Sequence, residues 1–150
     1  MAAERKPDCI VDAATLTGAC VVALGEEIAG IFGTDRDLTR TFIDAGAGEG
    51  ELFWELPLHR PYEDQIKATV ADCKNIGSRW GGSIIGAVFL KAWVPNGVKW
   101  VHCDIAGPAG KEDSLGHLGK GAKGFGVKTT VAFLRRLGGS APSADARGRS

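Results

Sequence analysis

One stretch limits the possible folds of this chain more than any other. Residues 12–19 read Asp-Ala-Ala-Thr-Leu-Thr-Gly-Ala and lie between two apolar runs, residues 9–11 and 20–24. This pattern predicts a buried strand, a tight turn and the start of a helix, which is the repeating unit of α/β folds. In an open α/β sheet, ligands bind beside the turns that follow the strands, and backbone N–H groups at a helix start attract anions.

The turn also carries groups that suit ligand binding. Thr15 and Thr17 add hydroxyl groups, and Gly18 lets the backbone approach a ligand closely. The alternative is an ordinary strand-to-helix turn that is built from small residues and binds nothing.

The sequence of residues 12–19 resembles the Asp-x-Ala-Thr-Leu-Thr-Gly-Ala signature of the leucyl (cytosol) aminopeptidases. Further segments look like the family's later blocks and occur in the family's order: residues 54–58, 71–77, 81–84, 104–107 and 120–127. Six ordered blocks carry the resemblance, which extends over most of the chain.

The resemblance implies an α/β fold with three layers, in which a mainly parallel central sheet has helices on both faces. Residues 1–137 would form the C-terminal part of the family's catalytic domain. Residues 138–150 are rich in Gly, Ser, Ala and Arg, and we expect a disordered tail there.

The family's chemistry is the metal-dependent release of N-terminal residues from peptides. The resemblance implies two divalent cations, manganese, zinc or magnesium, which polarise the scissile carbonyl and activate a bridging water. In the family, the metal ligands, the catalytic lysine and an arginine motif precede the strand that begins here at Cys9, and no matching segment is present. We therefore expect no catalytic residue and no metal ligand in this chain, and no hydrolysis by the chain alone. The alternative is a catalytically inactive relative that binds peptides or docks on an intact enzyme.

The same resemblance implies which residues meet the substrate. The backbone of Thr15, Leu16 and Gly18 would hold the peptide and any bound anion. Ile76, Ala106 and Ala109 would shape the pocket for the substrate's side chain, and small residues at 106 and 109 would leave room for a bulky one. The expected partners are a peptide substrate and further copies of the chain, since the family forms hexamers, and the expected location is the cytoplasm.

Residues 98–106 alternate as a strand does, with Val101, Cys103 and Ile105 on one face and Trp100, His102 and Asp104 on the other. His102 and Asp104 therefore point the same way and suggest a base with its orienting carboxylate, or two metal ligands. A buried histidine that is hydrogen-bonded to a carboxylate or the backbone is the structural alternative, and we favour it.

Residues 119–124 match the pattern G-x-G-x-x-G of dinucleotide-binding loops. No predicted strand precedes the match and no acidic residue follows at the required spacing, so we reject that function. The segment looks instead like the family's Lys-Gly-Ala-Thr-Gly loop, with Lys123 where threonine is usual.

The other elements follow from periodicity and turn residues. We expect a helix over 19–25, a strand over 28–32, a helix that Thr34 caps, an edge segment over 52–58, a helix opened by Pro61, a strand over 68–73 and a buried helix over 83–94. Leu38, Phe42 and Ala45 form the predicted apolar face of the second helix, and Val127, Val131 and Leu134 that of a last helix. Glu49, Glu51 and Glu55 are expected to lie on a solvated loop.

Charge and cysteine content exclude several classes of protein. The formal net charge is zero at pH 7, so no basic field favours nucleic acid. The charged N-terminus is unlike a signal peptide, and no apolar stretch is long enough to predict a membrane span. The widely spaced residues Cys9, Cys20, Cys73 and Cys103 indicate reduced thiols rather than a disulfide framework.

Overall fold

The central element of the fold is a four-stranded sheet. The computed structural model describes residues 2–111 and 121–139, and the strand order within them is β1-β4-β2-β3. The strands are β1 (Cys9–Ala14), β2 (Ile28–Gly33), β3 (Leu52–Glu55) and β4 (Lys99–Asp104). β1 is parallel to β4 and β2 is parallel to β3, while β2 and β4 are antiparallel. The predicted α/β class with a mainly parallel sheet is confirmed.

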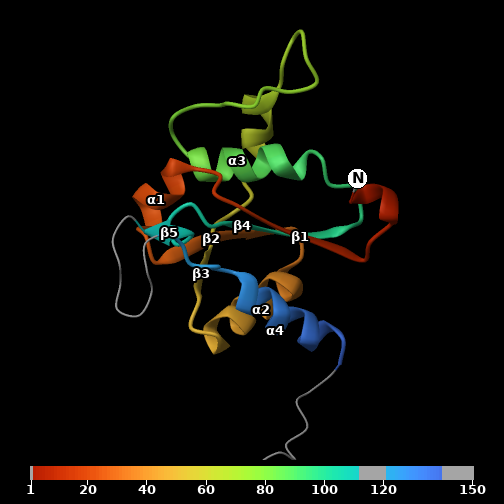
Figure 1. Ribbon diagram of the computed structural model, residues 1–150. Helices are drawn as coiled ribbons and strands as arrows, with labels where there is room; N and C mark the ends of the chain where they lie inside the picture. Colours follow the sequence, from red (N-terminus) through yellow and green to blue (C-terminus); the bar gives the residue numbers. More distant parts are fainter. Residues whose placement is uncertain (1, 112–120, 140–150) are drawn as a thin grey trace, which may run out of the picture.

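Helices cover both faces of the sheet (Figure 1). One face carries α1 (Gly18–Leu24) and α3 (Gly82–Lys91), and the other carries α2 (Arg36–Gly48) and α4 (Val127–Leu137). Shorter elements are the 3-10 helices η1 (Ala3–Arg5) and η2 (Arg60–Ile66) and a hairpin of β5 (Gly110–Lys111) and β6 (Gly121–Ala122). The expected three layers are therefore present.

Alternate side chains of β4 enter two different hydrophobic cores. Val101 and Cys103 pack against the face that holds α2 and α4, in a cluster with Phe42 and Phe133. Trp100 packs on the opposite face with Phe32 and Ala87. The alternation predicted for this strand is confirmed, and burial on both faces makes β4 a central strand.

The start of α2 differs by one residue from the prediction. Its N-cap is Asp35 rather than Thr34, and the Asp35 carboxylate accepts a hydrogen bond from Leu38 N at 2.8 Å. The Thr34 hydroxyl instead accepts from Trp100 N at 2.9 Å and so fixes the beginning of β4. The predicted apolar face of α2 is buried, through Leu38, Phe42 and Ala45.

The strand predicted over residues 68–73 is wrong. This segment is irregular, and Val70 is 97% exposed. Lys74 N donates to Ile66 O at 2.7 Å, so the segment closes as a loop on η2 and no strand of the sheet pairs with it.

The orientation predicted for α4 is also wrong. Val127, Val131 and Leu134 are 61, 46 and 59% exposed, whereas Thr129 and Phe133 are buried. The ring centroids of Phe133 and Phe42 lie 5.1 Å apart. Burial of a large aromatic side chain stabilises the fold more than burial of a valine does, so Phe133 sets which face of α4 points inward.

The segment that leads into β3 contains a further correction. β3 is an edge strand, as expected for residues 52–58, and Glu49 and Glu55 are exposed. Glu51 is only 7% exposed and is not on a solvated loop. Its carboxylate accepts hydrogen bonds from Gly126 N, Thr129 N and Thr129 Oγ1, at 3.0, 3.2 and 2.5 Å. Glu51 thus caps the start of α4, whose own N-cap, Gly126, has no side chain.

The four cysteines are free thiols. Cys20 and Cys103 are buried, and Cys9 and Cys73 are partly exposed. Burial raises the pKa of the Cys103 thiol far above its usual range, and the nearby Asp12 carboxylate raises it further.

Two predicted features lie partly or wholly outside the described residues. They are the beginning of the loop over 119–124 and the tail from residue 140 onward. Within the described ranges, no helix is both long enough and apolar enough to cross a membrane.

Candidate functional site

The turn between β1 and α1 is built by a helix cap. Thr17 is the N-cap of α1, and its hydroxyl accepts from Cys20 N at 3.1 Å. This cap places Thr15 and Gly18 at the exposed surface of the turn and leaves Leu16 partly buried. The turn therefore presents backbone to solvent at the carboxyl end of β1, as expected for a ligand-binding turn.

The loop after β4 lies beside this turn. Because β1 and β4 are parallel neighbours with Ala14 opposite Asp104, both segments leave the sheet at the same edge. Ile105 N continues the pairing by donating to Ala14 O at 2.9 Å. Ala106 and Ala109 follow in a turn and are partly exposed. The structure thus brings five of the six predicted substrate-binding residues to one edge of the sheet.

The sixth predicted residue, Ile76, lies on the irregular segment before α3. Its side chain is 78% exposed and belongs to none of the hydrophobic clusters of the described residues. The neighbouring Gly77 packs against Ile85 of α3. A pocket role for Ile76 stays a prediction.

A single buried carboxylate joins the turn to the loop. Asp104 has no exposed surface, and its Oδ1 accepts from Leu16 N, Thr17 N and Ala106 N at 3.1, 3.3 and 3.2 Å. Its Oδ2 accepts from Thr17 Oγ1 at 2.6 Å. The sequence indicates for Asp104 only a role beside His102, as its orienting carboxylate or as a second metal ligand. The position of Asp104 at the end of a predicted strand is the one feature of the sequence that indicates its place at the edge of the sheet. The structure adds that this strand pairs with β1.

These hydrogen bonds limit what the turn can offer to a ligand. The N–H groups of Leu16 and Thr17 already donate to Asp104. The Leu16 backbone therefore has its carbonyl left for a ligand, and an anion near the turn would have to meet Gly18 instead.

A second hydroxyl and a thiol lie beside Thr17 and the backbone of Asp104. Ser83 Oγ, at the start of α3, lies 3.2 Å from Thr17 Oγ1, and Cys20 Sγ donates to Asp104 O at 3.7 Å. Burial raises the pKa of the Cys20 thiol, and the charge of Asp104 adds to the increase. Cys20 is thus a neutral packing residue and not an activated nucleophile.

His102 pairs with Asp12 and not with Asp104. His102 Nδ1 lies 2.6 Å from Asp12 Oδ1, and Trp100 Nε1 donates to Asp12 Oδ2 at 2.6 Å. The imidazole has no exposed surface and stacks with the rings of Phe32 and Trp100, each at 5.9 Å. Its Nε2 is buried and has no hydrogen-bond partner among the described residues. The histidine is a buried structural group bonded to a carboxylate, which is the alternative that we favoured.

The described residues do not fit the two divalent cations that the resemblance implies. Residues 2–111 and 121–139 contain no group of three or more His, Cys, Asp or Glu side chains that could hold a metal ion. The carboxylates of Asp12, on β1, and Asp104, at the end of β4, are occupied by hydrogen-bond donors. No chemical step through a metal can therefore be assigned to these residues.

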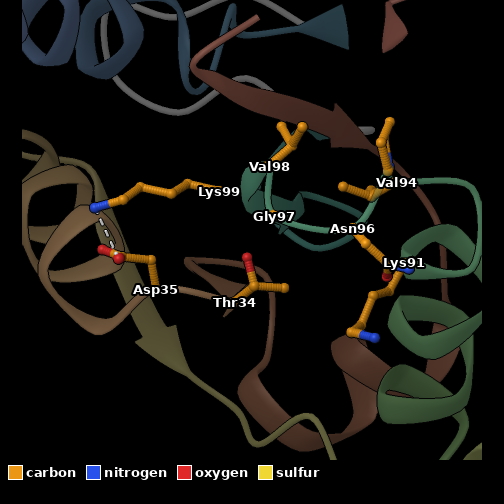
Figure 2. Close-up of a pocket in the computed structure, with 9 residues that line it drawn as sticks. Thr34, Asp35, Lys91, Val94, Asn96, Gly97, Val98 and Lys99 are labelled. Atoms are coloured by element: carbon orange, nitrogen blue, oxygen red, sulfur yellow. Dashed lines mark ion pairs between the residues drawn. The ribbon is translucent and has the colours of Figure 1, made fainter. Parts of the chain in front are cut away.

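A cavity of about 410 Å³ lies at the opposite end of β4 (Figure 2). Its walls include Thr34, Asp35, Lys91 and residues 94–99, and Lys99 Nζ pairs with Asp35 Oδ2 at 2.8 Å. The pKa of Asp35 is lowered and that of Lys99 is raised, in each case mainly by the hydrogen bond between them. Lys99 begins β4 and Asp104 ends it, so this cavity is separate from the candidate site.

Comparisons with known proteins agree with the sequence resemblance. The model of the cytosol aminopeptidase family, catalytic domain, matches residues 1–131. A probable cytosol aminopeptidase from Prochlorococcus marinus is 49% identical over 130 residues, which are 87% of this chain and 26% of the relative. One from Aquifex aeolicus is 47% identical over 137 residues, covering 91% of this chain and 28% of the relative.

Solved structures show the same similarity. A mutant of tomato leucine aminopeptidase has a TM-score of 0.83 and 41% identity, covering 90% of this chain and 26% of that one. The bottromycin maturation enzyme BotP, in complex with Mn, has a TM-score of 0.81 and 39% identity, covering 87% and 29%.

This chain spans about a quarter of the length of the curated relatives that it matches. The match nevertheless includes β1, its turn, β4 and the loop that follows, all within the matched residues 1–131. On these grounds, the chain belongs to the cytosol aminopeptidase family and corresponds to part of its catalytic domain.

Proposed function

We propose that this chain forms walls of the peptide-binding site of a metal-dependent aminopeptidase, which releases N-terminal residues from peptides. The observation that carries the proposal is the meeting of the β1–α1 turn and the 106–109 loop at one edge of the sheet. Ligands of open α/β sheets bind beyond the carboxyl ends of the strands, and this edge is such a place.

The proposed roles take into account that the N–H groups of Leu16 and Thr17 already donate to Asp104. The carbonyls of Thr15 and Leu16 and the backbone of Gly18 bind the peptide main chain. Ala106 and Ala109 leave space for the side chain of the first peptide residue, because neither extends beyond a methyl group. Ile76 adds an apolar wall when the irregular segment before α3 folds towards the site.

We propose that two divalent cations, manganese or zinc and in some cases magnesium, serve the hydrolysis. Since the described residues gather no metal-binding cluster, the ligands would come from polypeptide outside them. The BotP relative was solved with Mn, which supports manganese as the first ion to test. The names of the relatives support a cytoplasmic location, and a homo-oligomer, with hexamers as the family's habit, is part of the same proposal.

The test uses the purified 150-residue chain with leucine p-nitroanilide and Mn²⁺. We expect no release of p-nitroaniline, because residues 2–111 and 121–139 gather no cluster of side chains that could hold the cations. We also expect the tripeptide Leu-Gly-Gly to shift the NMR signals of Thr15, Gly18 and Ala106, with no comparable change at the far end of β4.

Two results would contradict the proposal. The first is the absence of any shift at the turn up to saturating peptide. The second is Mn²⁺-dependent turnover that EDTA stops. If His102→Ala abolished such turnover, a hydrolase built on His102 and Asp104 would become the better hypothesis.

A second candidate function is docking by a catalytically inactive relative. The observation that favours it is exposed apolar surface on several elements, through Leu52, Trp54, Val127 and Leu134. Sedimentation velocity of this chain mixed with an intact aminopeptidase tests it, since a docking chain sediments with the intact enzyme. Under the first proposal, a fragment that supplies the metal ligands restores turnover when it is mixed with this chain.

A further inference from the structure

We propose that Asp104 is a positioning residue for peptide binding: its carboxylate holds the β1–α1 turn and the 106–109 loop in register, so that a peptide meets both segments already ordered. This inference rests on the proposed function, because it concerns the same site. It adds a residue that contacts no ligand and acts through Leu16, Thr17 and Ala106.

The geometry places this carboxylate at a junction between two segments that are 88 residues apart in sequence. Beyond the last strand pair, the Ile105 N to Ala14 O bond is the remaining backbone link between turn and loop. All other hydrogen bonds by which the described residues join the two segments end on Asp104, on Oδ1 from the amides and on Oδ2 from the Thr17 hydroxyl.

A chain of hydrogen bonds also connects the Asp104 carboxylate to α3, through Thr17 and Ser83. The Thr17 hydroxyl has one proton, which points to Asp104 Oδ2 at 2.6 Å. Its oxygen is then the acceptor for Cys20 N and for the Ser83 hydroxyl. Ser83 therefore donates to Thr17, and Thr17 donates to Asp104, so one carboxylate sets the cap of α1 and its contact with α3.

Tight packing leaves the loop little freedom to compensate for a lost carboxylate. At Gly107, an added Cβ would lie 2.2 Å from Gly25 O at the end of α1. At Gly86 of α3, it would lie 2.9 Å from Thr17 and 3.0 Å from Leu16. Backbone that must be ordered at the moment of binding weakens affinity, and backbone that is ordered beforehand does not.

Asp104→Ala and Asp104→Asn test the inference, with Glu51→Ala as the matched control. Glu51 is a similarly buried carboxylate that accepts from two amides and a threonine hydroxyl, but it holds α4 on the other face of the sheet. Each ¹⁵N-labelled chain is titrated with Leu-Gly-Gly at a temperature where it is folded by circular dichroism. Hydrogen exchange of the amides of Leu16, Thr17 and Ala106 is measured without peptide.

We expect Asp104→Ala to weaken peptide binding at least tenfold and to speed exchange at these three amides. Asp104→Asn keeps one carbonyl oxygen for the amides, so its affinity should stay within about threefold of the wild type and its amides should stay protected. Glu51→Ala should change affinity less than twofold, although it destabilises the fold.

If Asp104 is a positioning residue, peptide affinity should fall in each folded variant whose three amides exchange faster, and it should not fall where these amides stay protected. Equal weakening by Asp104→Ala and Glu51→Ala would show a general loss of stability and overturn it. Tenfold weaker binding by Asp104→Asn with all three amides still protected would also overturn it, and this outcome remains decisive if Asp104→Ala does not fold. A wild-type chain that binds no peptide would overturn the proposed function. Slow exchange at the three amides in Asp104→Ala would instead overturn the positioning role alone.

Discussion

Replacing Glu51 by alanine should destabilise the protein far more than replacing its neighbour Glu49. Both carboxylates belong to the same short segment before β3, and their charges are identical. Glu51 is 7% exposed and accepts three hydrogen bonds from the start of α4, whereas the side chain of Glu49 is exposed. The comparison therefore isolates what the contacts contribute.

The magnitude follows from the groups left without a partner. Loss of a helix cap costs about 1 kcal/mol, and α4 has no other side-chain cap. Thr129 has no exposed surface, so its N–H and hydroxyl would each lose a partner in the interior, at about 1–3 kcal/mol each. The sum is about 3–7 kcal/mol, a large part of the roughly 5–15 kcal/mol that stabilises a typical domain.

Urea unfolding followed by circular dichroism measures this difference. We expect Glu51→Ala to lower the free energy of unfolding by about 3–7 kcal/mol and the melting temperature by about 6–28 °C. Glu49→Ala should stay within about 0.5 kcal/mol of the wild type. A double-mutant cycle with Thr129→Val should give a coupling of about 1–3 kcal/mol, since the two groups contact directly.

Equal effects of the two glutamate substitutions would refute the reasoning. So would a coupling energy near zero, because the carboxylate would then stabilise the chain by something other than the α4 cap.

Three further predictions follow from other contacts. Gly107→Ala should lower the free energy of unfolding by about 2 kcal/mol or more, because its Cβ would lie 2.2 Å from a backbone oxygen of Gly25; unchanged urea midpoints would contradict this. The Asp35–Lys99 pair should stabilise the fold above the unfolded pKa of aspartate, about 4, and lose this effect as pH falls through the lowered pKa of Asp35. Melting temperatures of the wild type and of Lys99→Met should accordingly converge as the pH is lowered through the pKa of Asp35. A thiol reagent at pH 8 should modify the native chain at no more than the two partly exposed cysteines, with Cys20 and Cys103 reacting only in denaturant; four fast thiols would argue against the buried positions.

Much of the fold could be predicted because repeating contacts leave a period in the sequence. The alternation along residues 98–106 predicted which side chains of β4 enter which core, and the spacing of Leu38, Phe42 and Ala45 predicted the buried face of α2. The same method failed for α4. A spacing of apolar residues was present there, but Phe133 and Thr129 decided which face points inward.

The family resemblance predicted candidate residues for the site. It did not predict the buried hydrogen bonds that lie behind them. Asp104 and Glu51 act through hydrogen bonds to segments 75 to 88 residues away, and such contacts impose no pattern on the neighbouring sequence. His102 and Asp104 share a face of β4, but the carboxylate that reaches His102 comes from β1. Sequence spacing within one strand could not indicate which of the two acids is the partner.

The burial of Trp100 determines how the protein will fluoresce. Trp100 is 1% exposed, while Trp54, Trp80 and Trp93 are 63, 77 and 60% exposed. The native emission spectrum should thus already resemble that of indole in water, and denaturation should move its maximum only slightly. Acrylamide should quench three of the four indoles readily, and the resistant emission would come from the strand that carries His102 and Asp104. The emission that resists quenching therefore reports whether the centre of the sheet is folded, independently of the three exposed indoles.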